Sequence, residues 1–329
     1  MTVGLRAALE SGRLLRATGA HSALSARLVE EAGFDVVWSS GLEISAVAGV
    51  PDADILTMPR FLEAAAEMAE AVAIPVLADC NSGYGNPSNV AYMVRAFEAR
   101  GVAGVCIEDK LFPKLNSFVA GDHALASAAD FAAKIRAAVE SRRSRDLMVV
   151  ARIEALISGR GLDEALRRAG VYERAGADAL LIHSKEPEPD EVFAFRERYR
   201  GDLPVIVIPT TYHQVIAAEL AERGFGMVIY ANHGLRCSIS AMRRTFARII
   251  EDGTTGNVEQ TMASLQDVFD LQHVREMTER QRRFETQGRE LAAPGDTPPA
   301  APSTNGRSPG GSGAGSPAPS IPTRSGSPE

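Results

Sequence analysis

Cysteine is scarce in this sequence, and long apolar runs are absent. The 329 residues include three cysteines, Cys80, Cys106 and Cys237, which lie far apart. Because the number is odd and no pair has the spacing of metal ligands, we expect neither a disulfide framework nor a cysteine metal site. This usage suits a reducing compartment. No run of about 18 apolar residues is present, so no membrane-spanning helix is expected.

Two further signals are missing. The first 16 residues contain no apolar stretch followed by a small-residue cleavage site, which argues against secretion and favours a cytoplasmic protein. No block of Lys and Arg dominates and the formal net charge is -7, so neither nucleic acid nor a membrane surface is an expected partner. The acidic balance favours solubility and says little about the substrate. We therefore expect a partner that is a small molecule.

What the sequence does contain is an ordinary globular composition, with 45% apolar and 23% charged residues. Near Ala292 the composition changes sharply, and from there to Glu329 the chain is mostly Pro, Gly, Ser, Ala and Thr. Such a segment buries too little apolar surface to offset its chain entropy. We expect one folded domain over residues 1–290 and a disordered tail over 291–329. A core of about 250 residues or more suits a single large α/β barrel.

One local pattern recurs along the folded part: a helical stretch, a Gly, then a short apolar strand. Gly33 precedes Phe34–Trp38, and Gly101 precedes Val102–Ile107. Gly suits the position just after a helix, where φ is positive, so the pattern predicts the αβ half of a βαβ unit. Eight apolar strands follow, near Leu14–Ala17, Val36–Ser39, Ile74–Ala78, Ala103–Ile107, Leu147–Ala151, Ala179–Ile182, Val205–Ile208 and Met227–Tyr230.

These strands are apolar throughout, which is typical of parallel strands that are covered on both faces. Eight βα units indicate a closed (β/α)8 TIM barrel rather than an open sheet. A further helical stretch, Met262–Arg283, follows the eighth unit and has no obvious place to pack. We expect this extra C-terminal helix to dock on a neighbouring subunit.

Active sites of such barrels form at the carboxyl ends of the strands, where polar residues gather in this sequence. Asp79 and Glu108 end adjacent strands, and hard oxygen ligands there suit Mg²⁺, which takes only one or two carboxylates and keeps several waters. The alternative is that both carboxylates cap loops or pair with Lys110 and Arg152. Trp38 to Leu42 follow the second strand, and the turn at Ser40, Gly41 and Leu42 could offer backbone N–H groups to a carboxylate, although by itself it is only a turn.

Two further strand ends carry cationic or titratable groups. The guanidinium of Arg152 can hold a carboxylate or phosphoryl group with two hydrogen bonds, or it can form a salt bridge with Glu154 or Glu108. His183 could donate to a phosphoryl oxygen or make a structural hydrogen bond. The stretch Lys110–Asp122 has little periodicity, and we interpret it as a lid that brings Lys114 and Asn116 over the substrate. The alternative is a mobile loop without a chemical role.

These residues match a known family: the sequence resembles phosphoenolpyruvate mutase, in the isocitrate lyase superfamily. The resemblance covers nearly all of Leu5 to about Arg283. Its most specific motif is Glu108-Asp109-Lys110, five residues, then Asn116-Ser117. Supporting motifs are Ser40-Gly41-Leu42, Gly83-Tyr84-Gly85-Asn86, Ala151-Arg152-Ile153-Glu154-Ala155, His183-Ser184-Lys185 and Ala231-Asn232-His233.

The resemblance implies rearrangement of phosphoenolpyruvate to phosphonopyruvate, the reaction that opens phosphonate biosynthesis, in a homotetramer that exchanges a C-terminal helix. It implies Mg²⁺ held directly by Asp79 and through water by neighbouring groups including Glu108. It also implies substrate contacts from Ser40, Gly41, Leu42, Arg152 and His183, with Trp38 beside them. Asp52 matches a functionally important aspartate, and Lys114, Asn116 and Ser117 match the gating loop of the family.

One position departs from the family pattern: Asn81 stands where a second acidic residue is usual. Asn can still orient a metal-bound water, but a negative charge near the cation is lost, so we expect weaker Mg²⁺ binding with the geometry retained. Asn81 is also compatible with an alternative function, that of an inactive or repurposed homologue that binds a ligand without turnover.

Other activities on the same barrel remain open. A phosphonopyruvate hydrolase is similar over Pro51–Leu56, but similar relatives carry Thr where this chain has Asn116, which favours the mutase. A carbon–carbon lyase such as methylisocitrate lyase would need a catalytic Cys in its lid. No Cys lies between Lys110 and Ser117. We interpret Cys80 as a residue that packs in the barrel wall.

Overall fold

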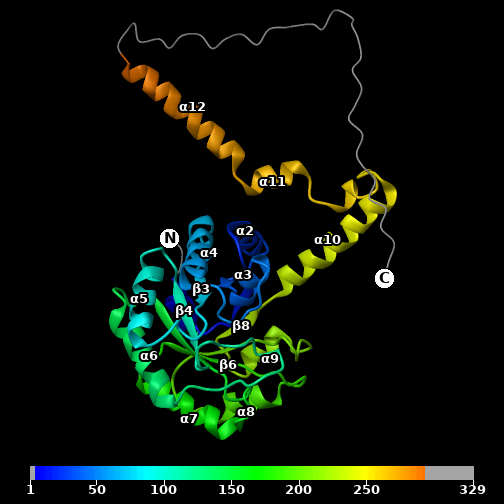
Figure 1. The fold of residues 1–329 in the computed structure, drawn as a ribbon. Helices are drawn as coiled ribbons and strands as arrows, with labels where there is room; N and C mark the ends of the chain where they lie inside the picture. Colours follow the sequence, from blue (N-terminus) through cyan, green and yellow to red (C-terminus); the bar gives the residue numbers. More distant parts are fainter. Residues whose placement is uncertain (1–3, 293–329) are drawn as a thin grey trace, which may run out of the picture. The chain divides into compact units, whose positions relative to one another are not determined.

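The structure, a computed structural model, describes residues 4–292 of the chain. Eight parallel strands close into a barrel in which each strand pairs with the next and β8 returns to β1, as the sequence predicted (Figure 1). Their bounds are β1 Leu15–Ala20, β2 Val36–Ser39, β3 Val76–Asp79, β4 Gly104–Glu108, β5 Met148–Ile153, β6 Ala179–Ile182, β7 Val205–Val207 and β8 Met227–Tyr230.

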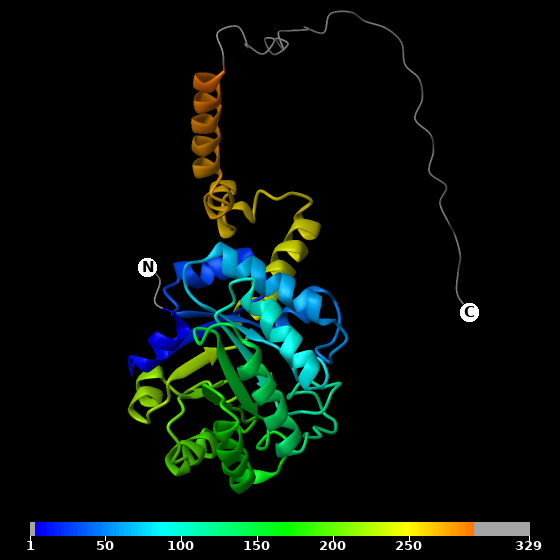
Figure 2. The same ribbon diagram turned by 90° about the vertical axis from the view of Figure 1, so that its left-hand side faces the viewer.

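Helices alternate with these strands and surround them, which Figure 2 shows from the side. The helices are α1 Leu5–Glu10, α2 Ala23–Glu31, α3 Gly41–Val47, α4 Met58–Ala71, α5 Pro87–Glu98, α6 Ala128–Ser141, α7 Gly161–Arg174, α8 Asp190–Arg198, α9 Ala217–Glu222, α10 His233–Asp252, α11 Leu265–Leu271 and α12 Val274–Leu291. None of those in residues 4–292 is both long and apolar enough to cross a membrane.

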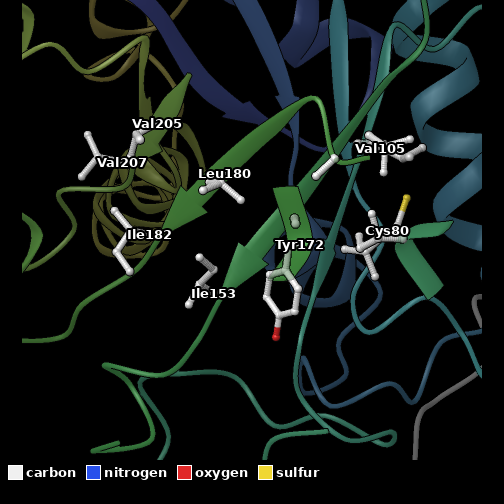
Figure 3. Close-up of a cluster of buried hydrophobic side chains, with 14 of the residues drawn as sticks. Cys80, Val105, Ile153, Tyr172, Leu180, Ile182, Val205 and Val207 are labelled. Carbon is white, nitrogen blue, oxygen red and sulfur yellow. The ribbon is translucent and has the colours of Figure 1, made fainter. Parts of the chain in front are cut away.

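The apolar strands are buried on both faces because alternate side chains enter two different cores. On β6, Leu180 and Ile182 pack outward against the helices, while Ala179 and Leu181 fill the barrel interior. Figure 3 shows part of the outer core, where Cys80 lies among apolar side chains. Cys80 is fully buried in the barrel wall, as the sequence predicted. This double burial leaves polar residues room only at the strand ends.

The end of the chain departs from the predicted single helix over Met262–Arg283. The segment contains α11 and α12, separated at His273, whose positive φ of 55° ends the first helix. The chain divides after Val274 into two compact units, and nearly all of α12 belongs to the second. The predicted tail over 291–329 lies outside the described residues, apart from its first two.

The helix after β8 is also unusual. α10 is 20 residues long, contains no buried residue and runs away from the strands in Figure 1. Met242, Phe246 and Ile250 recur along it at helical spacing, and they are 46%, 60% and 86% exposed. An apolar stripe on a helix normally faces a core. This stripe has none within residues 4–274.

Candidate active site

A polar pocket lies at the carboxyl ends of the strands, where the fold predicts the active site. It encloses about 460 Å³ including its opening, which suits a small ligand. Its lining combines carboxylates, cations and a few apolar side chains. The lining residues are Trp38, Ser40, Leu42, Asp52, Asp79, Glu108, Lys114, Asn116, Ser117, Phe118, Arg152, His183, Ile208, Thr210, Ala231 and Asn232.

The structure places eleven of the thirteen predicted site residues in this lining, and the other two, Gly41 and Asn81, lie next to Asp79. Their individual roles stay predictions. The sequence interpretation did not single out Phe118, which lies within the predicted lid Lys110–Asp122 and meets the His183 ring edge-on with 5.5 Å between centroids. It named Glu154 in a motif and as an ion-pair partner of Arg152 but gave it no place in the site, although Glu154 follows Arg152 by two residues, directly after β5.

The lid between β4 and α6 is closed against the turn after α3. The Lys114 ammonium lies 2.7 Å from Asp52 Oδ1, and the Asn116 side-chain amide donates to Asp52 Oδ2 at 2.7 Å. Burial pushes the pKa of Asp52 upward, but Lys114, Asn116 and Arg152 outweigh it, so this pKa is lowered. Burial opposes the charge on Lys114, yet Glu108, Asp52 and Asp79 raise its pKa. Both groups are therefore charged at neutral pH.

Glu154 lies beneath the pocket, fully buried, and joins four polar side chains. Its Oε1 accepts from Arg152 Nε at 2.5 Å, and its Oε2 accepts from the Ser117 hydroxyl at 2.7 Å and lies 3.2 Å from Lys110 Nζ. Burial raises the pKa of Glu154, but Arg152, His183 and Lys110 more than reverse this and hold it well below its usual range. The predicted salt bridges of Arg152 are present, to Glu154 and, at 3.4 Å, to Glu108.

His183 Nδ1 lies between a cationic side chain and a carboxylate. Arg152 Nη2 lies 2.8 Å from His183 Nδ1, and Glu154 Oε1 lies 3.0 Å from the same nitrogen. Nδ1 accepts from the guanidinium when the ring proton is on Nε2, and it donates to the Glu154 carboxylate when the proton is on Nδ1. Burial and the charge of Arg152 lower the pKa of His183, which favours the neutral ring. Nε2 is buried without a partner among the described residues, so it is available to a ligand in the pocket.

The predicted metal ligands form a cradle of oxygen atoms. Asp79 and Glu108 end β3 and β4, and the Asn81 backbone N–H donates to Asp79 Oδ1 at 3.1 Å. In the described part of the chain, Asn81 Oδ1 and Glu108 Oε1 are buried without a hydrogen-bond partner. A Cβ at Gly41 would come within 3.1 Å of both Asn81 Oδ1 and Asp79 Oδ2. Burial raises the pKa of Asp79 against the charges of Lys114 and Arg152, and a cation bound beside this carboxylate would lower it.

These residues fit Mg²⁺. Residues 4–292 contain no group of three or more His, Cys, Asp or Glu side chains arranged for a metal. Groups of three or four such ligands are typical of Zn²⁺ sites. Mg²⁺ instead binds through one or two carboxylates and keeps waters. Asp79 and Glu108 supply the carboxylates, and the uncommitted amide of Asn81 can orient a water.

We expect Asn81→Asp to tighten the apparent affinity for Mg²⁺ by about tenfold, because it restores a negative charge beside Asp79 and Glu108. Titration of activity, or of the fluorescence of the single tryptophan Trp38 in the pocket lining, measures this. Asn86→Asp is the control: Asn86 caps α5, where Asp caps equally well, so the same charge is added elsewhere. Unchanged or weaker affinity in Asn81→Asp would contradict the expectation.

Comparisons with known proteins agree with the geometry. The family model described as phosphoenolpyruvate phosphomutase matches residues 5–250. The phosphonopyruvate hydrolase of Variovorax sp. (strain Pal2) is 46% identical over 270 residues, which cover 82% of this chain and 93% of the hydrolase. The crystal structure of phosphoenolpyruvate phosphomutase from Streptomyces platensis subsp. rosaceus has a TM-score of 0.84 and 54% identity, covering 85% of this chain and 98% of that one.

A phosphonopyruvate hydrolase has also been solved in complex with oxalate and Mg²⁺. It has a TM-score of 0.81 and 44% identity, and the match covers 85% of this chain and 97% of that chain. Mutases and hydrolases thus match at similar identity, over nearly their whole length. The chain is an enzyme that belongs to the phosphoenolpyruvate phosphomutase family, within the PEP mutase/isocitrate lyase superfamily.

Proposed function

We propose that this enzyme is a phosphoenolpyruvate mutase, which interconverts phosphoenolpyruvate and phosphonopyruvate and needs Mg²⁺. The observation that carries the proposal is the contact of Asn116 with Asp52. The Asn116 side chain donates to the carboxylate, and its backbone N–H donates to the Asp52 carbonyl at 3.1 Å. Both bonds hold the lid closed over the pocket. A closed, dry pocket favours transfer of a phosphoryl group within the substrate over its capture by water.

The pocket residues divide the charge of such a substrate between them. Arg152 and the neutral His183, in the tautomer with its proton on Nε2, would hold the phosphoryl oxygens. Backbone N–H groups of Gly41 and Leu42, at the start of α3, would receive the carboxylate. Asp79, Glu108 and Asn81 would hold Mg²⁺, which would supply positive charge beside the developing enolate. Lys114, ion-paired to Asp52, closes the pocket from the lid side.

The rearrangement needs no covalent intermediate with the protein. In phosphoenolpyruvate the O–P bond breaks and leaves pyruvate enolate with a metaphosphate-like group. Carbon three of the enolate then donates its electron pair to phosphorus, which forms the C–P bond of phosphonopyruvate. A loose transition state of this kind depends on positioning and charge stabilisation. Arg152 is suited to both, because Glu154 and Glu108 fix its guanidinium from two sides.

The second candidate is phosphonopyruvate hydrolase, favoured by the similarity to the Variovorax enzyme. The two activities share the pocket and differ in what accepts the phosphoryl group released from phosphonopyruvate, which is the enolate oxygen in the mutase and water in the hydrolase. Asn116 favours the mutase because its amide donates to Asp52 while its Oδ1 accepts from the Phe118 backbone N–H at 3.1 Å. A Thr side chain has no amide with which to make this pair of bonds.

The test is to incubate the purified enzyme with phosphonopyruvate and Mg²⁺ and to follow the ³¹P NMR spectrum. A phosphoenolpyruvate signal is the expected result, since the equilibrium lies on that side. Inorganic phosphate that appears first, together with pyruvate, would replace the mutase with the hydrolase. An unchanged spectrum would count against both activities and favour a different substrate or a binding role.

We also propose a cytoplasmic homotetramer in which a helix is exchanged between subunits. The support is the apolar stripe Met242, Phe246 and Ile250 on α10, which follows the eighth strand without covering its own barrel. Light scattering should give a tetramer for the wild type and a smaller species for Phe246→Glu. Arg244→Glu, on the opposite face of α10, should leave the size unchanged. A monomeric wild type would contradict this proposal.

A further inference from the structure

The turn over residues 51–54 is the docking platform of the closed lid. Two of its aspartates engage consecutive parts of the lid. Asp52 holds the Lys114 ammonium and the Asn116 amide, as described above. Asp54 accepts the backbone N–H of Lys114 on Oδ2 at 2.7 Å. The bond therefore fixes the backbone at the residue whose ammonium reaches the pocket, which side-chain contacts alone do not do.

Asp54 differs from Asp52 because it does not line the pocket. Its backbone has a φ of 54°, in the left-handed region that costs energy for a residue other than glycine. Burial raises the pKa of its carboxyl to about 6, against the bond from Lys114. Other charges near it are those of Glu108 and Asp52, and Lys134 and Tyr84 also interact with it. The strained backbone and the half-buried carboxylate of Asp54 both cost free energy. The bond that Asp54 makes to the lid is therefore the feature that needs an explanation.

We propose that Asp54 is a positioning residue that latches the lid at Lys114 and so decides whether the phosphoryl group is passed back to the enolate or lost to water. The proposal rests on the mutase function proposed above. Asp54 acts through the lid backbone and not on the substrate. With the latch in place, Lys114 and Phe118 close the pocket. Without it, Asp52 holds the lid by side-chain bonds and one backbone bond near Asn116, and water enters more often.

Loss of the phosphoryl group to water has a defined product. When the C–P bond of phosphonopyruvate breaks inside an open pocket, a water oxygen forms the new bond to phosphorus and yields inorganic phosphate. The electron pair of the C–P bond stays on the enolate, which takes one proton at carbon three and becomes pyruvate. No oxidant or further reactant is required. The ratio of phosphate to phosphoenolpyruvate therefore reports how well the lid excludes water.

Three variants separate the latch from its alternatives. Asp54→Ala removes the acceptor, and Asp54→Asn keeps a neutral oxygen that can still accept from Lys114 N–H. Asp122→Ala is the matched control, because Asp122 is an exposed aspartate of the same lid. Hydrogen–deuterium exchange of the lid peptide 110–126 is measured by mass spectrometry in the resting protein at pH 8, where the Asp54 carboxyl is ionised. Product ratios are measured on the same samples by ³¹P NMR with phosphonopyruvate and Mg²⁺.

We expect Asp54→Ala to speed exchange in the lid about tenfold, to raise the phosphate fraction at least fivefold and to raise KM more than it lowers kcat. Asp54→Asn should stay within about twofold of the wild type, and so should Asp122→Ala. Lid exchange that is equal in Asp54→Ala and the wild type would overturn the latch. Faster lid exchange in Asp54→Ala with an unchanged ratio of phosphate to phosphoenolpyruvate would show that the latch does not control the access of water. If the wild type itself makes only phosphate, the mutase function fails, while lid exchange still decides the latch.

Discussion

Replacing Glu154 with Gln is expected to lower kcat for phosphonopyruvate by roughly 100- to 1,000-fold, the range seen when a preorganised electrostatic contact is removed. Glu154 does not line the pocket, so the loss arises through its neighbours. Its two oxygens orient Arg152 and Ser117, and its charge offsets Arg152 and Lys110 in a buried place. Gln keeps the shape but presents an NH₂ donor to groups that are themselves donors. At least one of these donor side chains must then move away from the Gln side chain.

The measurement is kcat and KM at a temperature where the variant is folded, with Glu140→Gln as the control. Glu140 is an exposed residue of α6 that pairs with Arg136, and its replacement should leave kcat within twofold. A loss confined to KM would show that Glu154 affects only uniform binding of the substrate. Wild-type kcat in Glu154→Gln would disprove its positioning of Arg152.

The second large effect concerns stability: Arg168→Met should lower the free energy of unfolding by about 3 to 5 kcal/mol, the cost of leaving a buried charge without its partner. Asp109 is fully buried, and its Oδ2 accepts from Arg168 Nη1 at 2.9 Å and from the Tyr172 hydroxyl at 2.6 Å. Arg168 also donates to the Ala126 carbonyl at the end of the lid. Removing the guanidinium leaves the Asp109 carboxylate with two neutral donors, the Tyr172 hydroxyl and the Glu154 backbone N–H, and without its cation.

Arg167→Met is a close control, because Arg167 is the exposed neighbour that binds the same Glu164. Arg167→Met should lower the free energy of unfolding by under about 0.5 kcal/mol, because exposed ion pairs contribute little.

The pH dependence of the stability of Arg168→Met gives a second check. Burial already raises the pKa of Asp109, and loss of Arg168 raises it further, so the variant's deficit should shrink as pH falls and the carboxyl takes up a proton. The midpoints of denaturant unfolding measure the stability of both variants at each pH. Equal midpoints for Arg168→Met and Arg167→Met would contradict the role given to Arg168.

The barrel and most of the pocket could be predicted without coordinates, because their signals are local. A Gly between a helix and an apolar strand recurs with the βα unit, and three strands, at Val36–Ser39, Ala179–Ile182 and Met227–Tyr230, begin and end where the sequence indicated. The other strands differ by one to three residues at an end. Since side chains after parallel strands meet at one rim, Asp79, Glu108 and Arg152 could be expected together.

What the sequence by itself determined is therefore the order of strands and helices, the kind of residue at each strand end and, through its motifs, the family. Only the tertiary structure decided which of those residues touch. Asp54 and Lys114 are 60 residues apart, and Glu154 meets His183 across 29. Periodicity reports which face of an element is buried, but a contact between elements depends on how the closed barrel and its folded lid bring them together. The same reason explains α10, whose apolar stripe predicts a partner surface that residues 4–274 do not supply.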